Sequence, residues 1–317
     1  MTPAPRPGAP RTAANWPIAA AMLPFGSTDS RGGPIHDAAP EEWARHLRMV
    51  RRLGFTEVDP TDTWVRIGDL EPARLEEFRG VLADAGLTVP AVSTSRRSVM
   101  DPERGAEYLA YSHRLLDAAA ALDVPVVSFG FFQDFTPAQR EVLWFWLAEG
   151  WHDDLSPEAR ARAAALIREL AEHAAANGQQ ITLEMYEDTY VGTCDAAVRF
   201  LEEVGHDACG LNPDIGNFVR LHRPIEPVQD MLDKVLPYAN YWHVKNYARD
   251  EDPATGQVMT FPVPMELGLI DYRSAIGQAL DLGFRGAFLC EHYGNDAITI
   301  IGRNRAYLRE ILGTLVD

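Results

Sequence analysis

The chain has 317 residues, of which 46% are hydrophobic and 24% charged, as is typical of a globular protein. Its net charge of −17 argues against binding to nucleic acid, because phosphates require a basic surface. No apolar run approaches the roughly 18 residues of a membrane-spanning helix, so no membrane association is expected. The three scattered cysteines form no disulfide framework and favour a reducing cytoplasm.

The first segment, residues 1–15, is rich in Pro and Ala and has no apolar core. We expect a disordered leader here and not a signal peptide. After it, eight strand-like runs alternate with eight amphipathic helical runs. The strands are predicted at 17–23, 55–60, 87–94, 124–132, 180–187, 208–214, 240–246 and 286–293. The helices are predicted near 41–53, 70–85, 103–122, 157–176, 194–205, 225–235, 271–282 and 303–315.

Eight β–α units in a chain of this length predict a (β/α)8 TIM barrel, with residues 16–317 forming one catalytic domain. A doubly wound open sheet is the competing architecture, but its glycine-rich nucleotide-binding motifs do not occur. Two segments are longer than ordinary connections, namely 133–155 after the fourth strand and 248–270 after the seventh. In a barrel, both follow the carboxyl ends of strands, where active sites are built.

The last four strands each carry a potential metal ligand near the carboxyl end. These are Glu184 in ITLEMYE, Asp214 in GLNPD, His243 in YWHVKN and Glu291 in FLCEHY. Three carboxylates and one imidazole brought together at the strand ends require a cation, because buried like charges repel one another. The set therefore predicts a site for one divalent metal, with Mn²⁺ as the first choice and Mg²⁺, Co²⁺ and Zn²⁺ also compatible.

Side chains two residues along a strand point to the same face, so Tyr186, Lys245 and Tyr293 are expected beside these ligands. The two tyrosines are predicted substrate contacts. Lys245 has two interpretations. It is either a catalytic charge partner for a substrate oxygen near the metal or a structural ion-pair partner of a carboxylate.

The order Glu, Asp-x-Gly, His-Val-Lys, Glu over strands five to eight resembles that of the xylose-isomerase-like barrels, which include sugar-phosphate isomerases and epimerases and the ketose 3-epimerases. The resemblance implies that Glu184, Asp214, His243 and Glu291 are the metal ligands. It also implies that the two glutamates exchange a proton with the carbon next to the substrate carbonyl. Asn217 stands where many members have a histidine that touches the substrate or a second metal. Asn217 is therefore a predicted substrate contact, and the departure leaves both the substrate and a multinuclear site open.

Three further segments, 20–38, 61–70 and 267–296, resemble the large subunit of bacterial C-glycoside deglycosidases. This resemblance implies cleavage of the carbon–carbon bond between a 3-oxo-sugar and an aromatic aglycone, together with a small partner (beta) subunit. We take this lyase as the first choice and a sugar isomerase or epimerase acting on a keto-sugar as the alternative. Both reactions begin with removal of a proton next to a carbonyl, assisted by the metal. A non-catalytic sugar-binding barrel is the third possibility.

The segment 133–155 supplies a candidate general base, His152, a free imidazole near the expected mouth of the barrel. Its aromatic residues, Trp144, Phe145, Trp146 and Trp151, have two interpretations. They predict either a substrate-binding wall that includes Trp146, or an amphipathic helix packed on the barrel or on a partner.

Other polar residues are weaker candidates. Asn240, Asn246 and Arg249 lie around the seventh strand and could bind sugar hydroxyls. The pair Arg96–Arg97 is interpreted as a solvated loop pair, although a local arginine cluster is able to bind an anionic substrate.

Overall fold

The barrel wall consists of eight short parallel strands in the part of the chain that the computed structural model describes, residues 11–294 and 296–316. The strands are β1 (Ile18–Ala21), β2 (Glu57–Asp59), β3 (Val92–Ser93), β4 (Val126–Phe129), β5 (Gln180–Glu184), β6 (Cys209–Asn212), β7 (Trp242–Val244) and β10 (Phe288–Cys290). They form two sheets, in the orders β2–β1–β10–β7 and β3–β4–β5–β6. Parallel bridges between Glu57 and Thr88 and between Leu211 and Ala239 join the sheets into a closed ring. The predicted TIM barrel is therefore confirmed.

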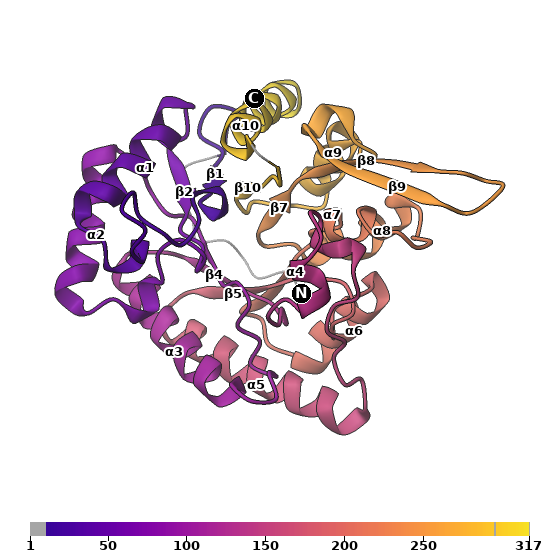
Figure 1. Ribbon diagram of the computed structural model, residues 1–317, viewed down its shortest axis with the longest axis horizontal. Helices are drawn as coiled ribbons and strands as arrows, with labels where there is room; N and C mark the ends of the chain where they lie inside the picture. Colours follow the sequence, from indigo (N-terminus) through magenta and orange to yellow (C-terminus); the bar gives the residue numbers. More distant parts are fainter. Residues whose placement is uncertain (1–10, 295, 317) are drawn as a thin grey trace.

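The helices lie outside the ring of strands (Figure 1). They are α1 (Pro40–Arg52), α2 (Pro72–Ala85), α3 (Gly105–Ala121), α5 (Pro157–Ala176), α6 (Cys194–Val204), α8 (Val228–Val235), α9 (Tyr272–Asp281) and α10 (Ala297–Leu315). The local sequence explains α5 well: the Ser156 hydroxyl accepts from the Ala159 N–H, Pro157 opens the helix, and Gly178 follows its end at a φ of 72°. None of the helices in the described part of the chain is long and apolar enough to cross a membrane.

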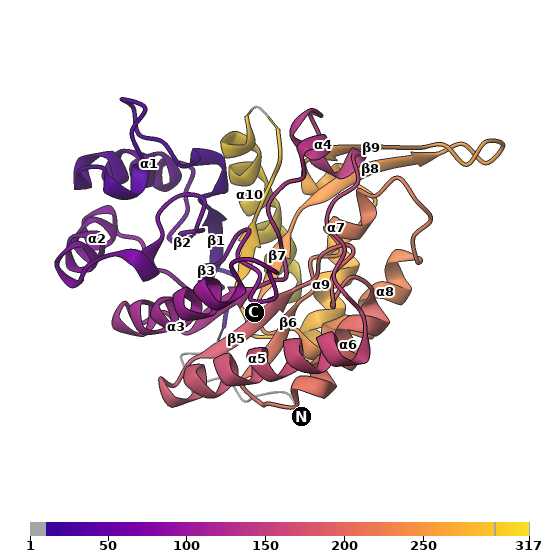
Figure 2. The ribbon, with the colours of Figure 1, turned by 60° about the horizontal axis from the view of Figure 1, so that its bottom comes forward.

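The two long connections fold differently from one another. Segment 133–155 contains only α4 (Pro137–Arg140) and a 3₁₀ turn at Phe145–Leu147, so the aromatic run is not the amphipathic helix that one interpretation predicted. Segment 248–270 contributes most of an antiparallel hairpin, β8 (Asn246–Glu251) with β9 (Val258–Val263). The hairpin projects away from the barrel in both views (Figures 1 and 2).

Mostly small residues fill the barrel interior next to the metal cavity, which Ala21 and Leu289 also line. One buried cluster there consists of Ala19, Ala21, Ala91, Tyr241, Ala287 and Leu289. The larger core lies between the strands and the helices and contains Trp43, Phe78 and Trp242. On β7 the side chains of Tyr241, His243 and Lys245 follow one face, as period two requires, and all three are buried.

The predicted leader lies mostly outside the described residues. Of its 15 residues, 11–15 are described and include a turn in which the Trp16 N–H donates to the Thr12 carbonyl. The Ala13 carbonyl accepts from Arg309 of α10 at 2.8 Å. A short helix, α7 (Gly216–Val219), follows β6 and carries Asn217 toward the strand ends.

Candidate metal centre

Four side chains from neighbouring strands converge at the carboxyl end of the barrel. Glu184 is the last residue of β5, Asp214 follows β6 by two residues, His243 is in β7, and Glu291 directly follows β10. One ligand atom from each lies within 4.8 Å of the others, and all four side chains are buried. The Nδ1 atom of His243 lies 3.2 Å from Glu184 Oε2, 3.7 Å from Glu291 Oε2 and 4.0 Å from Asp214 Oδ2. The structure therefore brings together the four side chains that the sequence analysis proposed as metal ligands.

Lys245 joins this cluster as an ion-pair partner. Its Nζ lies 2.6 Å from Asp214 Oδ2 and 2.7 Å from Glu291 Oε2, and the residue is 1% exposed. The three carboxylates carry three negative charges, and Lys245 offsets one. A divalent cation would offset the remaining two, and Asp214 Oδ1 is buried without a hydrogen-bond partner in the described structure. The residues present therefore fit a divalent metal with oxygen and imidazole ligands.

In the metal-free protein, protons bound to His243 and Asp214 offset part of the negative charge that the cation would offset. Burial lowers the pKa of His243, but the adjacent Glu184, Glu291 and Asp214 outweigh burial and raise it to about 9. Burial raises the pKa of Asp214 to about 7, against the opposing charge of Lys245. Burial raises the pKa of Glu291, but the positive charges of Lys245 and His243 outweigh burial and lower it to about 2. A metal ion that binds here must displace protons from His243 and, below neutral pH, from Asp214.

A hydrogen-bond relay holds the imidazole of His243 from behind. Ser93 Oγ donates to Asp59 Oδ2 at 2.7 Å, and its oxygen lies 3.2 Å from His243 Nε2. Tyr241 also donates to Asp59 Oδ2, at 2.7 Å, and burial raises the Asp59 pKa to about 6, so the carboxylate is mostly ionised at neutral pH. Because the Ser93 proton is given to Asp59, the Ser93 oxygen accepts from Nε2–H, which leaves Nδ1 as the ligand atom. The sequence analysis missed Asp59 and Ser93.

A cavity of about 240 Å³ opens above the cluster. Glu184, His243 and Glu291 line it, whereas Asp214 and Lys245 do not. Its walls include the aromatic rings of Phe132, Phe135, Phe145, Tyr186 and Tyr293 and, among others, the hydroxyl side chains of Thr61, Thr63, Ser93, Thr94 and Ser95. Two carboxylates beside an imidazole, under an aromatic wall, can exchange protons with a small polar ligand.

The structure brings both predicted tyrosines into this cavity. The hydroxyl of Tyr186 accepts from Arg96 Nη2 at 3.1 Å, and the ring centre of Tyr293 lies 5.4 Å from Lys245 Nζ. Arg96 lines the same cavity, with its guanidinium carbon 3.9 Å from the centre of the Phe135 ring. Arg97 pairs with Asp62 at 3.2 Å. The interpretation of Arg96 and Arg97 as a solvated loop pair was therefore wrong, because Arg97 pairs with the buried Asp62 and Arg96 lines the cavity and bonds to Tyr186 and Gln133.

Other predicted site residues lie elsewhere. Lys245 holds Asp214 and Glu291 instead of facing the cavity, which agrees with its structural interpretation. Asn217 is fully buried outside the cavity and donates to Glu184 Oε1 at 3.2 Å and to the Met185 carbonyl at 2.9 Å. It therefore positions Glu184 and is not in reach of a ligand in the cavity.

Trp146 lies behind the cavity wall. Its ring centre is 5.7 Å from that of Tyr293 and 5.5 Å from that of Tyr247, and the buried Arg220 guanidinium is 5.2 Å away. Its neighbour Phe145 takes the wall position that was predicted for Trp146, because the 3₁₀ turn points the two rings in different directions.

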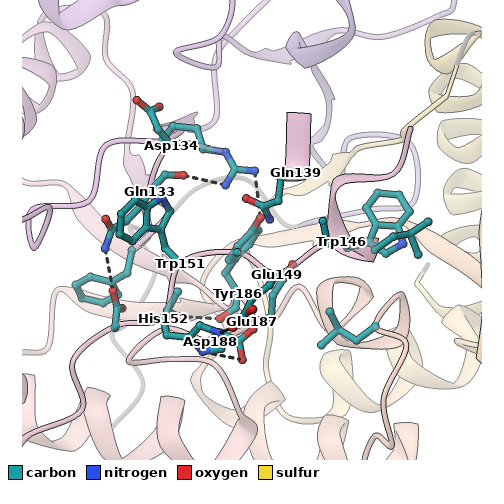
Figure 3. Close-up of a pocket in the computed structure, with 18 of the residues that line it drawn as sticks. Gln133, Asp134, Gln139, Trp146, Glu149, Trp151, His152, Tyr186, Glu187 and Asp188 are labelled. Atoms are coloured by element: carbon teal, nitrogen blue, oxygen red, sulfur yellow. Dashed lines mark hydrogen bonds and ion pairs between the residues drawn. The ribbon is translucent and has the colours of Figure 1, made fainter. Parts of the chain in front are cut away.

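The structure does not bring His152 to the metal cluster. Its side chain is 55% exposed and lies 3.9 Å from Asp188 and 3.5 Å from Glu149. It lines a different cavity, shown in Figure 3. His152 therefore cannot act as a base in the metal cavity without movement of its loop.

Three other residues that were predicted to bind sugar hydroxyls instead donate hydrogen bonds to backbone carbonyls. They are Asn240, Asn246 and Arg249. Asn240 donates to the Ile181 carbonyl, and Asn246 donates to the carbonyls of Met265 and Ile270. Both guanidinium nitrogens of Arg249 donate to carbonyls of the segment 219–223. Each of these polar groups is therefore engaged by backbone carbonyls, and none of the three residues lines the metal cavity.

Comparison with known proteins gives the family. The model of the xylose isomerase-like TIM barrel family matches residues 47–311. A search among curated proteins finds no match. A xylose isomerase-like TIM barrel protein from Mycobacterium smegmatis, solved in complex with magnesium, is 50% identical, with a TM-score of 0.94 over 97% of this chain and 100% of that chain.

More distant solved structures share the fold. An L-ribulose 3-epimerase is 17% identical, with a TM-score of 0.65 over 94% of this chain and 95% of that chain. The apo form of a 3-keto-D-glucoside 4-epimerase from E. coli is 16% identical, with a TM-score of 0.62 over 92% of this chain and 98% of that chain. The chain therefore belongs to the xylose isomerase-like TIM barrel family.

Proposed function

We propose that the protein is a divalent-metal-dependent sugar isomerase or epimerase that acts on a keto-sugar. One observation carries the proposal: of the three carboxylates in the ligand cluster, only Glu184 and Glu291 line the cavity. They are the two groups able to exchange protons with a ligand there. The ketose and keto-glucoside epimerases that share the fold support this choice of substrate class over the C-glycoside.

The reaction begins with transfer of the proton next to the sugar carbonyl to one glutamate. The divalent ion, held by Glu184, Asp214, His243 and Glu291, would polarise the sugar's oxygens and stabilise the developing negative charge. The other glutamate, which must be protonated when the substrate binds, then gives its proton to the opposite face for an epimerase or to the neighbouring carbon for an isomerase, and both glutamates afterwards exchange protons with solvent.

The cavity walls orient the sugar for this transfer. The rings of Phe135 and Phe145 suit the apolar face of a sugar, and Arg96 and Tyr186 offer donors for its oxygens. Lys245 Nζ donates to Glu291 Oε2 at 2.7 Å and so fixes one carboxylate oxygen. Asn217 does the same for Glu184 from the other side.

Magnesium becomes the first candidate for the resident ion. The M. smegmatis relative was solved with magnesium, whereas the ligand types alone favoured manganese. Mn²⁺, Co²⁺ and Zn²⁺ stay compatible with the same mixed oxygen and imidazole ligands.

A carbon–carbon lyase acting on a 3-oxo-C-glycoside is the second candidate. It uses the same first proton transfer and then expels the aglycone. The three phenylalanines of the wall, Phe132, Phe135 and Phe145, would suit an aromatic aglycone, and this is the observation that favours it. If the protein catalyses this reaction, we expect it to act together with the small partner subunit.

The test is a product assay in D₂O on protein loaded with Mg²⁺ or Mn²⁺, with and without EDTA. The substrates are free ketoses, methyl 3-keto-glucoside and a 3-oxo-C-glucoside. Deuterium in an epimerised or isomerised sugar, abolished by EDTA, supports the proposal. Aglycone release from the C-glucoside would replace it with the lyase. Equal turnover with and without bound metal would contradict both.

A further inference from the structure

A second cavity, of about 350 Å³, lies beside the metal cavity. Arg96 and Tyr186 line both cavities, so these two side chains form the wall between them. The Arg96 guanidinium bridges this wall, since it donates to the Tyr186 hydroxyl at 3.1 Å and to the Gln133 carbonyl at 3.1 Å. The side chains of Arg96 and Tyr186 therefore separate a ligand in one cavity from the other cavity.

The lining of the second cavity suits an uncharged, polyhydroxylated ring. Trp151 offers an indole that is 53% exposed, although it lines a cavity. The cavity is also lined by Asp134, by Asp188, which pairs with Arg223 at 2.9 Å, and by Gln133, whose amide donates to Asp153 at 3.4 Å. Asp134, Asp188 and Gln133 are labelled in Figure 3. An aromatic face together with several hydrogen-bonding groups is the combination that holds a sugar ring. Because Arg96 and Arg223 line the cavity beside the carboxylates, its charges are mixed and favour a neutral ligand over a charged one.

Two further features mark this cavity as a binding site. The indole nitrogen of Trp146, which also lines it, is buried with no hydrogen-bond partner among the described residues. Arg96 and Asp188 have φ angles of 54° and 59°, and they are two of the three non-glycine residues with positive φ in the described chain. Such backbone strain persists where function requires it.

The two cavities differ in volume, and this difference favours ligands of different size. The metal cavity, at about 240 Å³, is below the usual range for a drug-sized ligand, whereas the second cavity falls within it. A single keto-sugar suits the first cavity. A larger substrate would extend past Arg96 and Tyr186 into the second.

We propose that the second cavity binds a neutral second sugar ring, so that the substrate is a keto-disaccharide and not a free monosaccharide. This inference rests on the proposed function for the keto ring alone. The second ring is recognised by Trp151 stacking and by the carboxylates and amide around it. Arg96 lies where the two rings join.

The test compares the affinities of three probes by calorimetry on the Mg²⁺-loaded protein. They are methyl 3-keto-glucoside, 3-keto-cellobiose with the keto group on the non-reducing ring, and phenyl 3-keto-glucoside. We expect the disaccharide to bind about tenfold more tightly than the methyl glycoside, the size of one good aromatic contact. Trp151→Ala and Asp134→Ala should bring this ratio close to one. Phe261→Ala, which alters a residue of similar exposure, 49%, on the hairpin, should leave the ratio unchanged.

A second measurement does not need the keto group. Hydroxyl-radical footprinting, read by mass spectrometry, reports whether cellobiose protects Trp151 from oxidation. Protection together with the affinity ratio supports the inference. Equal affinities for the methyl glycoside and the disaccharide, or phenyl binding as tight as the disaccharide, would overturn it.

The two proposals fail in different ways. If the keto-sugars bind without any advantage for the disaccharide and Trp151 is not protected, the second-ring site is wrong and the proposed function stands. If no keto-sugar binds but cellobiose protects Trp151, the proposed substrate class is wrong and the second-ring site stands. If neither occurs, both are wrong.

Discussion

The metal cluster and the walls of its cavity come from different parts of the barrel. The four ligand residues lie in strands or within two residues of a strand end, and none is more than 8% exposed. The walls instead come largely from loops, with Arg96 after β3 and with Phe135 and Phe145 in segment 133–155. Strand ends are fixed by their neighbours, so groups placed there have little freedom. From this difference we infer that residues at the strand ends carry out the reaction and that loop residues select the ligand.

The two long connections extend this contrast. Segment 133–155 folds back over the barrel and supplies wall residues to the metal cavity. None of the residues that line that cavity belongs to segment 248–270, whose hairpin exposes Met259 and Phe261. Two connections at equivalent positions in the barrel therefore serve different surfaces.

The largest expected effect comes from a strand-borne carboxylate. Glu184→Gln should lower turnover about 10³-fold, because the amide cannot exchange a proton with the substrate. The measurement is the steady-state rate with saturating Mg²⁺, and circular dichroism checks the fold. Glu202→Gln, on the exposed face of α6, is the control and should match wild type. A Glu184→Gln rate close to wild type would remove Glu184 from the reaction.

The next effect concerns the two lysines of the chain, which form an internal comparison. Lys245→Met should lower the free energy of unfolding by about 3–5 kcal/mol in EDTA, because Asp214 and Glu291 lose a buried partner. Lys234→Met breaks two solvent-screened ion pairs at the surface and should change the free energy of unfolding far less than Lys245→Met. Urea unfolding measures both.

Excess Mg²⁺ should recover part of the stability of Lys245→Met, since a cation again offsets the carboxylates. If the two lysine variants prove equally stable in EDTA, then the charge balance that we assign to the cluster is wrong.

The relay behind His243 gives a smaller effect. Ser93→Ala should weaken metal binding about 10- to 100-fold, because Nε2 loses its acceptor and the ligand nitrogen is no longer fixed. Calorimetric titration of metal-free protein measures it. Ser112→Ala is the matched control, since its buried hydroxyl donates to a helix carbonyl of α3. An unchanged affinity in Ser93→Ala would show that the relay does not orient the ligand.

Metal affinity should also rise with pH. The pKa of His243 is raised to about 9 and that of Asp214 to about 7 in the metal-free protein, so the ion must displace these protons. Between pH 7 and 9 one proton is released, and the affinity should rise about tenfold per pH unit. Below pH 7 the slope should steepen as Asp214 also takes up a proton. An affinity that is flat from pH 6 to 9 would contradict these protonation states.

The smallest effect belongs to the loops. Phe145→Ala should raise the KM for a keto-sugar about three- to tenfold and leave kcat close to wild type, because Phe145 contacts the ligand without joining the reaction. Phe261→Ala on the hairpin should change neither constant. A large loss of kcat in Phe145→Ala would contradict the assignment of the reaction to strand-end residues and of ligand binding to loop residues.

The alternation of strands and helices made the barrel predictable, because each strand is a short buried run that ends in polar residues. The metal ligands were predictable for the same reason: Glu184, Asp214, His243 and Glu291 each come near the carboxyl end of a strand. The fold then brings these ends together without information from the loops.

Contacts across the barrel were not predictable in the same way. Ser93 and His243 are 150 residues apart, and a serine and an aspartate in early strands carry no signal of a relay. Trp146 and His152 were misplaced because the path of segment 133–155 depends on tertiary packing. In β9 the apolar Met259 and Phe261 are exposed whereas Thr260 is buried, so hydrophobicity gave no period-two signal for the hairpin.

The most direct test of the central claim is the metal content of the purified protein. Metal-free protein is dialysed against Mg²⁺ or Mn²⁺, and bound ions are counted by mass spectrometry for wild type, His243→Ala and Asp214→Asn. We predict one divalent ion per chain in wild type and loss of that ion in both variants. No bound ion in wild type, or an ion that both variants retain, would contradict the assignment of the four side chains as a metal centre.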